Sequence, residues 1–225
     1  HMEKQQGIDV VAGYVEPHAH PKTAALLNGL EVLPTREVFY NGMILDEFDI
    51  GMALKRKPQL ILVDELAHTN AEGCRHAKRY QDIKELLNAG IDVYTTVNVQ
   101  HIESLCDTVA SITEIVVRER IPDSIFDNAD QVELIDIEPQ DLINRLNTGN
   151  VYRQTQAKQA VENFFTIENL TALREISLRR CADRVNILTE NTRIKNHGDY
   201  HTGEHILVCL SSSPSNAKII RTDAK

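Results

Sequence analysis

Residues 60–70, LILVDELAHTN, run from four aliphatic side chains straight into two adjacent carboxylates. A short apolar run of this kind is typical of a buried strand in a parallel β-sheet. Asp64 and Glu65 would then stand where the strand leaves the sheet. Ligands of open parallel sheets bind outside the carboxyl ends of the strands. The stretch therefore predicts both a fold class and the place of a functional site.

Strand-like and helix-like stretches alternate on both sides of this segment. Apolar runs predict strands over residues 8–15, 60–63, 91–99, 115–118 and 131–137. Helical periodicity and end signals predict helices over residues 22–30, 46–57, 75–90, 101–112 and 139–149, and a short turn of helix is expected after Pro122. Short connections between alternating elements predict an α/β fold, with a parallel sheet covered by helices on both faces.

Two local patterns refine this expectation. Asn41-Gly42 lies between alternating apolar residues in REVFYNGMIL, residues 36–45, which predicts a β-hairpin with a two-residue turn. In the helix expected over 75–90, the spacing of Ile83, Leu86 and Leu87 places all three on one apolar face.

The pattern changes after residue 152. Two helices, 153–165 and 168–189, follow each other without a strand between them, and a polar stretch with two glycines comes next. The run HILVCL then begins a new strand, followed by a serine-rich turn. We expect four parts: the α/β domain (1–152), a helical extension (153–190), a linker (191–204) and the start of a further domain (205–225).

Composition excludes several classes of protein. The formal charge of −9 argues against nucleic-acid binding, which needs clustered Lys and Arg. No apolar run approaches the roughly 18 residues of a membrane helix, so we expect no membrane insertion by this segment. The four cysteines lie far apart, which favours a reducing, cytoplasmic setting.

Polar residues cluster where the predicted strands end. Carboxylates can order Mg²⁺ or position water, and hydroxyl, amide and imidazole groups can contact phosphates. The candidate nucleotide and magnesium residues are Asp64, Glu65, His68, Thr69, Thr96, Asn98 and Gln100. A simpler alternative remains open, in which the carboxylates cap the following turn and the histidines are ordinary loop residues.

Other features give weaker signals. A phosphate-binding loop needs the pattern GxxxxGK, but none of the ten glycines is followed by lysine, so we expect no firm nucleotide binding by these residues alone. We assign no metal site to His18 and His20, or to His197, His201 and His205, because such loop histidines are more often plain surface.

Several blocks resemble the N-terminal cytoplasmic domain of the KdpD family of bacterial sensor histidine kinases. The resemblance extends over about residues 3–190, and its most specific blocks are VDELAHTN at 63–70 and GIDVYTTVNVQHIESL at 90–105. RIPDSIFDNAD at 120–130 and NLTALREISLRRCADRV at 169–185 are also similar. Where family members often have Pro-Gly-Ser, this chain has Glu72-Gly73-Cys74, so the loop need not keep the family's shape.

The resemblance implies a P-loop NTPase-like domain in which Asp64 and Glu65 match the Walker B-like pair. It places the Walker A loop upstream of residue 1, and ATP and Mg²⁺ would then be cofactors of the intact protein only. Residues 205–225 match the first strand of a universal-stress-protein-like domain, too little to assign cyclic-dinucleotide binding.

The resemblance also implies a function. We expect a regulatory module on the cytoplasmic side of the bacterial inner membrane, within a sensor kinase that controls potassium transport genes. Its partners would be the rest of the kinase, a downstream response regulator and a second copy of itself. The kinase core is absent, so we expect no catalysis by this stretch alone. The alternative is a non-catalytic interaction scaffold whose Walker B remnant is structural; a free-standing small-molecule kinase is disfavoured because no lid region is evident.

Overall fold

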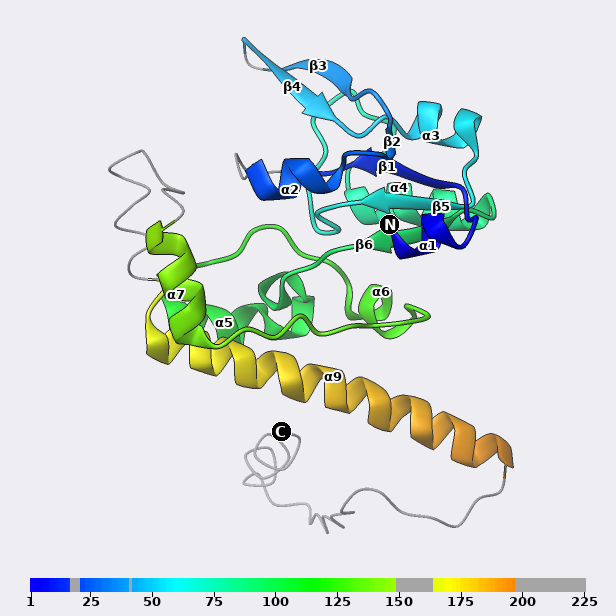
Figure 1. Ribbon diagram of the computed structural model, residues 1–225. Helices are drawn as coiled ribbons and strands as arrows, with labels where there is room; N and C mark the ends of the chain where they lie inside the picture. The colour runs from blue at the N-terminus through cyan, green and yellow to red at the C-terminus, as the bar shows by residue number, and fades with distance from the viewer. Residues whose placement is uncertain (17–20, 41, 149–163, 197–225) are drawn as a thin grey trace, which may run out of the picture. The chain divides into compact units, whose positions relative to one another are not determined.

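A computed structural model describes residues 1–16, 21–40, 42–148 and 164–196 (Figure 1). The chain divides into two compact units, His1–Arg179 and Arg180–Lys225. The first unit contains both β-sheets, and in the second the structure describes only residues 180–196, which belong to the last helix.

The centre of the first unit is a four-stranded parallel sheet. Its strands are β1 (Val10–Tyr14), β2 (Glu31–Val32), β5 (Leu60–Val63) and β6 (Asp92–Thr95), in the order β2-β1-β5-β6. Val11 and Ile61 are completely buried in adjacent strands. Gly13 is needed where β1 meets β5, because a Cβ there would lie 2.6 Å from Ile61 Cδ1. The α/β class and the parallel sheet predicted from sequence are confirmed.

Short helices precede and connect the strands. They are α1 (Met2–Gln5), α2 (Pro21–Leu26), α3 (Ile50–Arg56) and α4 (Arg79–Asn88), and α4 packs on both β6 and α3. The Asp49 side chain caps α3 by accepting a hydrogen bond from the Met52 amide at 2.9 Å. Ile83 and Leu86 lie buried on the core side of α4, whereas Leu87 is 49% exposed. The prediction that all three share one apolar face was therefore wrong for Leu87.

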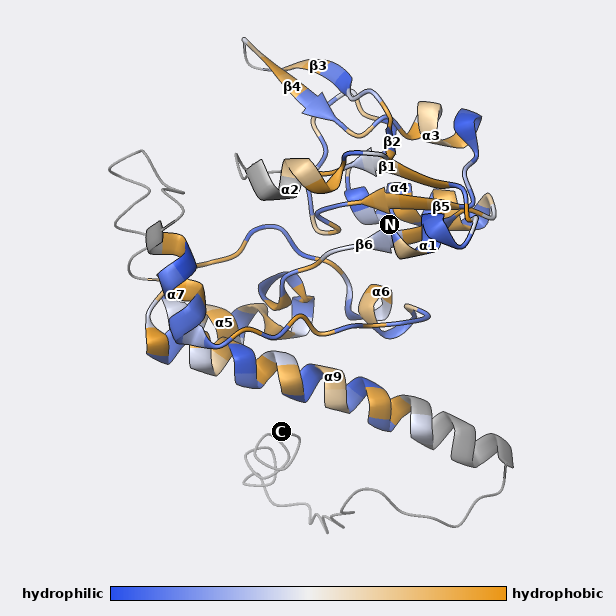
Figure 2. Ribbon diagram, in the orientation of Figure 1, coloured by the Kyte–Doolittle hydropathy of each residue, from blue (hydrophilic) through white to orange (hydrophobic). Residues whose placement is uncertain are grey.

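The predicted hairpin is present as a separate two-stranded sheet. β3 (Arg36–Tyr40) pairs antiparallel with β4 (Met43–Glu47), and Gly42 has the positive φ of +82° that its turn requires. The hairpin tip is hydrophobic, with Phe39 and Ile44 exposed (Figure 2). The helix predicted over 46–57 starts only at Ile50, because Asp46 and Glu47 complete β4.

The chain after β6 is more irregular than predicted. The helix expected over 101–112 is divided into two 3-10 turns, Val99–His101 and Glu103–Leu105, followed by α5 (Cys106–Thr113). Backbone hydrogen bonds from Glu103 to Ile121 and from Ile121 to His101 interrupt the helix. The helices after Pro122 and from residue 139 are confirmed as α6 (Asp123–Asp127) and α7 (Pro139–Thr148).

Two predicted strands, 115–118 and 131–137, are wrong: these residues are irregular. A strand forms only when its backbone groups pair with a neighbour. In the described part of the chain β6 pairs only with β5, and neither segment joins that edge. Val116 and Ile135 are accordingly 71% and 80% exposed.

The last described element is the long helix α9 (Ile167–Asn196). It confirms the helix predicted over 168–189 and continues past residue 190, where the linker was expected to begin. Arg174 of α9 pairs with Asp136 at 2.6 and 2.7 Å. The helix predicted over 153–165 lies almost entirely outside the described residues, as does the domain start at 205–225. None of the helices in the described stretches is long and apolar enough to cross a bilayer.

Candidate functional site

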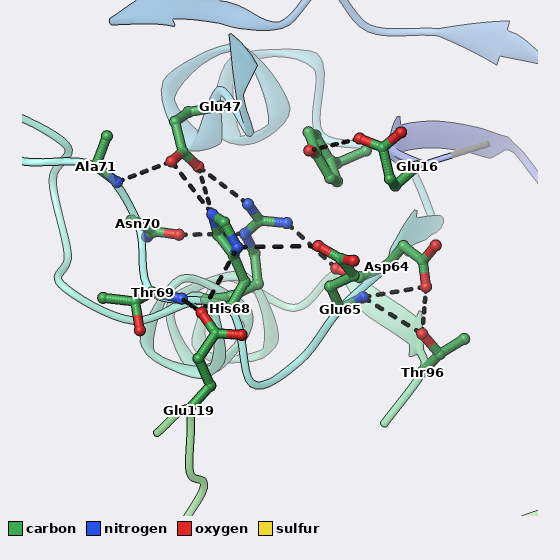
Figure 3. A network of polar contacts seen from close by, with 12 residues as sticks. Glu16, Glu47, Asp64, Glu65, His68, Thr69, Asn70, Ala71, Thr96 and Glu119 are labelled. Carbon is green, nitrogen blue, oxygen red and sulfur yellow. Dashed lines mark hydrogen bonds and ion pairs between the residues drawn. The ribbon is translucent and has the colours of Figure 1, made fainter. Parts of the chain in front are cut away.

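The carboxyl ends of β5 and β6 bring Asp64 and Thr96 into direct contact. These strands are parallel neighbours in which Val63 pairs with Thr95, so the next residues of both leave the sheet together. The Thr96 hydroxyl donates a hydrogen bond to Asp64 Oδ1 (Figure 3). The sheet register thus joins two residues that are 32 positions apart in the sequence.

The peptide between Asp64 and Glu65 is held from both sides. Its N–H, on Glu65, donates to Asp64 Oδ1 at 3.0 Å and to Thr96 Oγ1 at 3.3 Å. Its carbonyl oxygen, on Asp64, accepts a hydrogen bond from Arg79 Nη1 at 3.2 Å. Glu65 has a φ of +58°, a left-handed conformation that residues other than glycine seldom adopt.

Arg79, the first residue of α4, is completely buried and meets a buried carboxylate. Its Nη2 lies 3.1 Å from Oε2 of Glu47, the last residue of the hairpin, which is 3% exposed. The guanidinium also lies 4.3 Å from the centre of the Tyr14 ring. Burial, together with the charge of Glu16, raises the pKa of Tyr14 to about 12, so its hydroxyl stays protonated.

His68 lies among three carboxylates. Its Nε2 is 3.2 Å from both carboxylate oxygens of Glu47, while its Nδ1 is 3.8 Å from Glu65 and 4.0 Å from Glu119. Burial raises the pKa of Glu47, but hydrogen bonds from His68 and the Ala71 amide and the charge of Arg79 outweigh it, so the net pKa is lowered. Glu47 is therefore an anion at neutral pH.

Glu119 connects the irregular segment after α5 to this site. Its Oε1 accepts a hydrogen bond from the Thr69 amide at 2.8 Å, and the Thr69 hydroxyl accepts one from Lys78 Nζ at 2.6 Å. The His101 ring contacts the Glu119 carbonyl at 2.9 Å. Side chains from several separate segments thus meet next to the carboxyl ends of the strands (Figure 3).

Comparison with known proteins gives the family. The model of the KdpD family, described as the osmosensitive K⁺ channel His kinase sensor domain, matches residues 1–185. The chain belongs to this family.

Individual relatives agree with the family assignment. The chain is 57% identical to the sensor protein KdpD of Clostridium acetobutylicum and 52% identical to that of Escherichia coli. The alignments cover 100% and 99% of this chain, but 25% of each relative. A putative sensor protein KdpD of Synechocystis is 47% identical over 97% of this chain and 58% of its own length. The chain thus spans about a quarter of the length of the first two KdpD proteins.

Within this KdpD-family domain, the predicted residues separate into three groups. Glu65, His68, Thr96 and Asn98 line one cavity of about 70 Å³, together with His101 and Glu119. Asp64 and Thr69 are hydrogen-bonded to that group without lining the cavity. Gln100 lies in a 3-10 turn and does not line the cavity.

The oxygen donors at this site are too few to hold a magnesium ion by themselves, and would need water and phosphate oxygens beside them. Mg²⁺ usually takes one or two carboxylates, and water and phosphate oxygens complete its shell. Asp64 and Glu65 supply adjacent carboxylates, and Thr96 a hydroxyl. Among the described residues, no group of three or more His, Cys, Asp or Glu side chains could hold a metal. A cavity of about 70 Å³ is also far below the roughly 300–1,000 Å³ of typical ligand pockets.

Sequence reasoning missed three residues of this KdpD-family site: Glu47, Arg79 and Glu119. Glu47 was expected on a helix, and Glu119 followed a predicted strand that does not form. Arg79 falls within the helix expected over 75–90, and the structure buries it completely. Its position at the start of an amphipathic helix, directly after a polar loop, gave no signal that it turns inward.

Proposed function

We propose that this chain is a nucleotide-responsive regulatory domain of a membrane-bound sensor histidine kinase. In the intact protein, Mg²⁺ and ATP would bind next to Asp64 and Glu65 and shift the balance between kinase and phosphatase activity. The observation that carries the proposal is the contact of Asp64 with Thr96 at the carboxyl ends of adjacent parallel strands. Membership of the KdpD family supports the link to potassium transport.

Each residue has a defined task in this proposal. The bound Mg²⁺ would neutralise phosphate charge, as it does in nucleotide-binding proteins generally. Asp64 would hold the ion, because its carboxylate is fixed by the Thr96 hydroxyl and the Glu65 amide. Glu65 would orient a water molecule near the phosphate. His68 lies beside it, with its Nδ1 3.8 Å from Glu65 Oε2. The phosphate-cradling loop would come from outside these residues, consistent with a P-loop NTPase-like arrangement.

The proposal includes the setting of the whole protein. Relatives are named sensor proteins, so the domain would act on the cytoplasmic side of the bacterial inner membrane, within a homodimeric kinase that phosphorylates a response regulator. With a net charge of −9, it would have no nucleic-acid partner.

The test is calorimetric titration of the full-length kinase with Mg²⁺ and ATP, after the ATP site of the kinase core has been inactivated. We expect Asp64→Asn to weaken binding at least roughly tenfold, because a metal-binding carboxylate is replaced by a neutral amide. Asp92→Asn is the matched control, since Asp92 is exposed at the opposite, amino end of β6. Equal affinity of the Asp64→Asn variant and the wild type would refute the proposed site. An unchanged kinase-to-phosphatase ratio across ATP concentrations would favour the scaffold alternative.

A further inference from the structure

The conformation of Glu65 differs from that of the other left-handed residues of the fold. Lys57 and Glu114 also have positive φ angles, but both end helices, where a left-handed residue is common. Glu65 follows strand β5 and ends no helix. Its conformation is therefore maintained by the surrounding hydrogen bonds rather than by a capping motif.

These hydrogen bonds hold the Asp64–Glu65 peptide at opposite ends. Asp64 Oδ1 and Thr96 Oγ1 accept from its N–H, and Arg79 Nη1 donates to its carbonyl oxygen. A peptide that is fixed at both its N–H and its C=O cannot rotate about its flanking bonds. The Cα–Cβ bonds of Asp64 and Glu65 are then oriented with it.

Arg79 is itself immobilised. Its side chain is 0% exposed, its Nη2 bonds to Glu47, and its Nε lies 3.3 Å from Asn70 Oδ1. The guanidinium carbon also lies over the Tyr14 and Phe48 rings, 4.3 and 5.9 Å from their centres. The planar fork of arginine can satisfy all these partners at once, whereas the point charge of a lysine cannot.

We propose that Arg79 is a positioning residue. It holds the Asp64–Glu65 peptide so that Glu65 keeps its left-handed conformation, and it thereby directs both carboxylates toward bound Mg²⁺ and nucleotide. The second half of this inference rests on the proposed function, but the first half does not. Arg79 does not line the cavity beside Glu65, so it acts through the peptide and not by touching the ligand.

The first measurement needs no nucleotide. In the 225-residue chain, hydrogen exchange by NMR should show the Glu65 amide exchanging at least roughly tenfold faster in Arg79→Lys than in the wild type, because a charge-assisted hydrogen bond to the same peptide is lost. The amide of Ile61, inside β5, should keep its exchange rate. Arg75→Lys is the control, since Arg75 is exposed and pairs with Glu85 outside the network.

The second measurement is Mg²⁺ and ATP affinity of the full-length kinase, with the ATP site of its kinase core inactivated. Arg79→Lys should weaken binding roughly tenfold, and Arg75→Lys should leave it unchanged. Glu47→Gln, which removes the carboxylate charge that holds Arg79 Nη2, should also speed exchange at Glu65 if Arg79→Lys fails to fold.

The outcomes separate the two claims. Unchanged exchange at Glu65 in a folded Arg79→Lys protein, or in Glu47→Gln if only that variant folds, would overturn the positioning role, whatever the nucleotide result. Faster exchange at Glu65 with no nucleotide binding by the wild type would support the positioning of the peptide and refute the proposed function.

Discussion

Two arginines form ion pairs beside the parallel sheet, one at each end of its strands. Arg79, at the carboxyl ends, is fully buried and lies 3.1 Å from the buried carboxylate of Glu47. Arg56, at the amino ends, bonds to Asp9 at 2.8 Å and to Glu31 at 2.9 Å, but its side chain is 33% exposed and theirs are 41% and 48% exposed. The contacts are similar in length, whereas access to water differs completely.

The difference decides what each pair does. Exposed ion pairs contribute little to stability, because water and salt screen both charges. A buried pair has lost its water, so each charge depends on its partner, and removing one leaves the other uncompensated. The Arg79–Glu47 pair is therefore a fixed part of the candidate site, and the Arg56 cluster is a replaceable surface feature.

The largest effect should come from removing the buried cation. Arg79→Met keeps much of the side-chain volume but leaves Glu47 buried without its arginine, and we expect the free energy of unfolding to fall by roughly 3–5 kcal/mol. Urea unfolding of the 225-residue chain, followed by circular dichroism, measures this change. If the free energy of unfolding falls no more in Arg79→Met than in Arg56→Met, the two ion pairs do not differ as described.

A smaller, pH-dependent effect should follow from Glu47→Gln. The pKa of Glu47 is lowered in the folded state relative to its ordinary value of 4.5. Its charge therefore stabilises the fold above about pH 4.5, and this contribution is lost as the pH falls through the folded-state pKa. We expect Glu47→Gln to cost roughly 2–3 kcal/mol at pH 7 and progressively less below pH 4.5.

Unfolding curves of the Glu47 variant and the wild type between about pH 3 and pH 7 would check this prediction. A difference that is constant across that range would show that the charge of Glu47 is not what stabilises the fold.

The smallest effect should come from Arg56→Met, in the exposed cluster at the amino ends of the strands. The Arg56 guanidinium lowers the pKa values of Asp9 and Glu31, mainly through hydrogen bonds, but all three groups remain in water. We expect a small decrease in melting temperature that disappears at roughly 1 M salt, where charges are screened within a few ångströms. Thermal melts at low and high salt measure it. A large decrease that persists in salt would mean that this cluster is as structural as the buried pair.

The sequence was sufficient for the elements whose signals are local. The apolar run of β5, the Asn41-Gly42 turn and the end of α4 at Asn88, two residues before Gly90, can each be recognised within about ten residues. It also placed Asp64 and Thr96 at strand ends, and neighbouring parallel strands brought them together. It failed for residues 131–137, where the apolar alternation is present but no strand in the described part of the chain pairs with it.

The sequence by itself determined the α/β class, the position of the two carboxylates after β5 and the family resemblance, because these depend on periodicity and short motifs. Only the tertiary structure decided that Arg79 is buried, that Glu47 at the end of the hairpin pairs with it, and that Glu119 accepts a hydrogen bond from the Thr69 amide. These contacts join residues 32 and 50 positions apart. A charged residue can be buried only where the folded chain supplies its partner, and the sequence around Arg79 does not contain that partner.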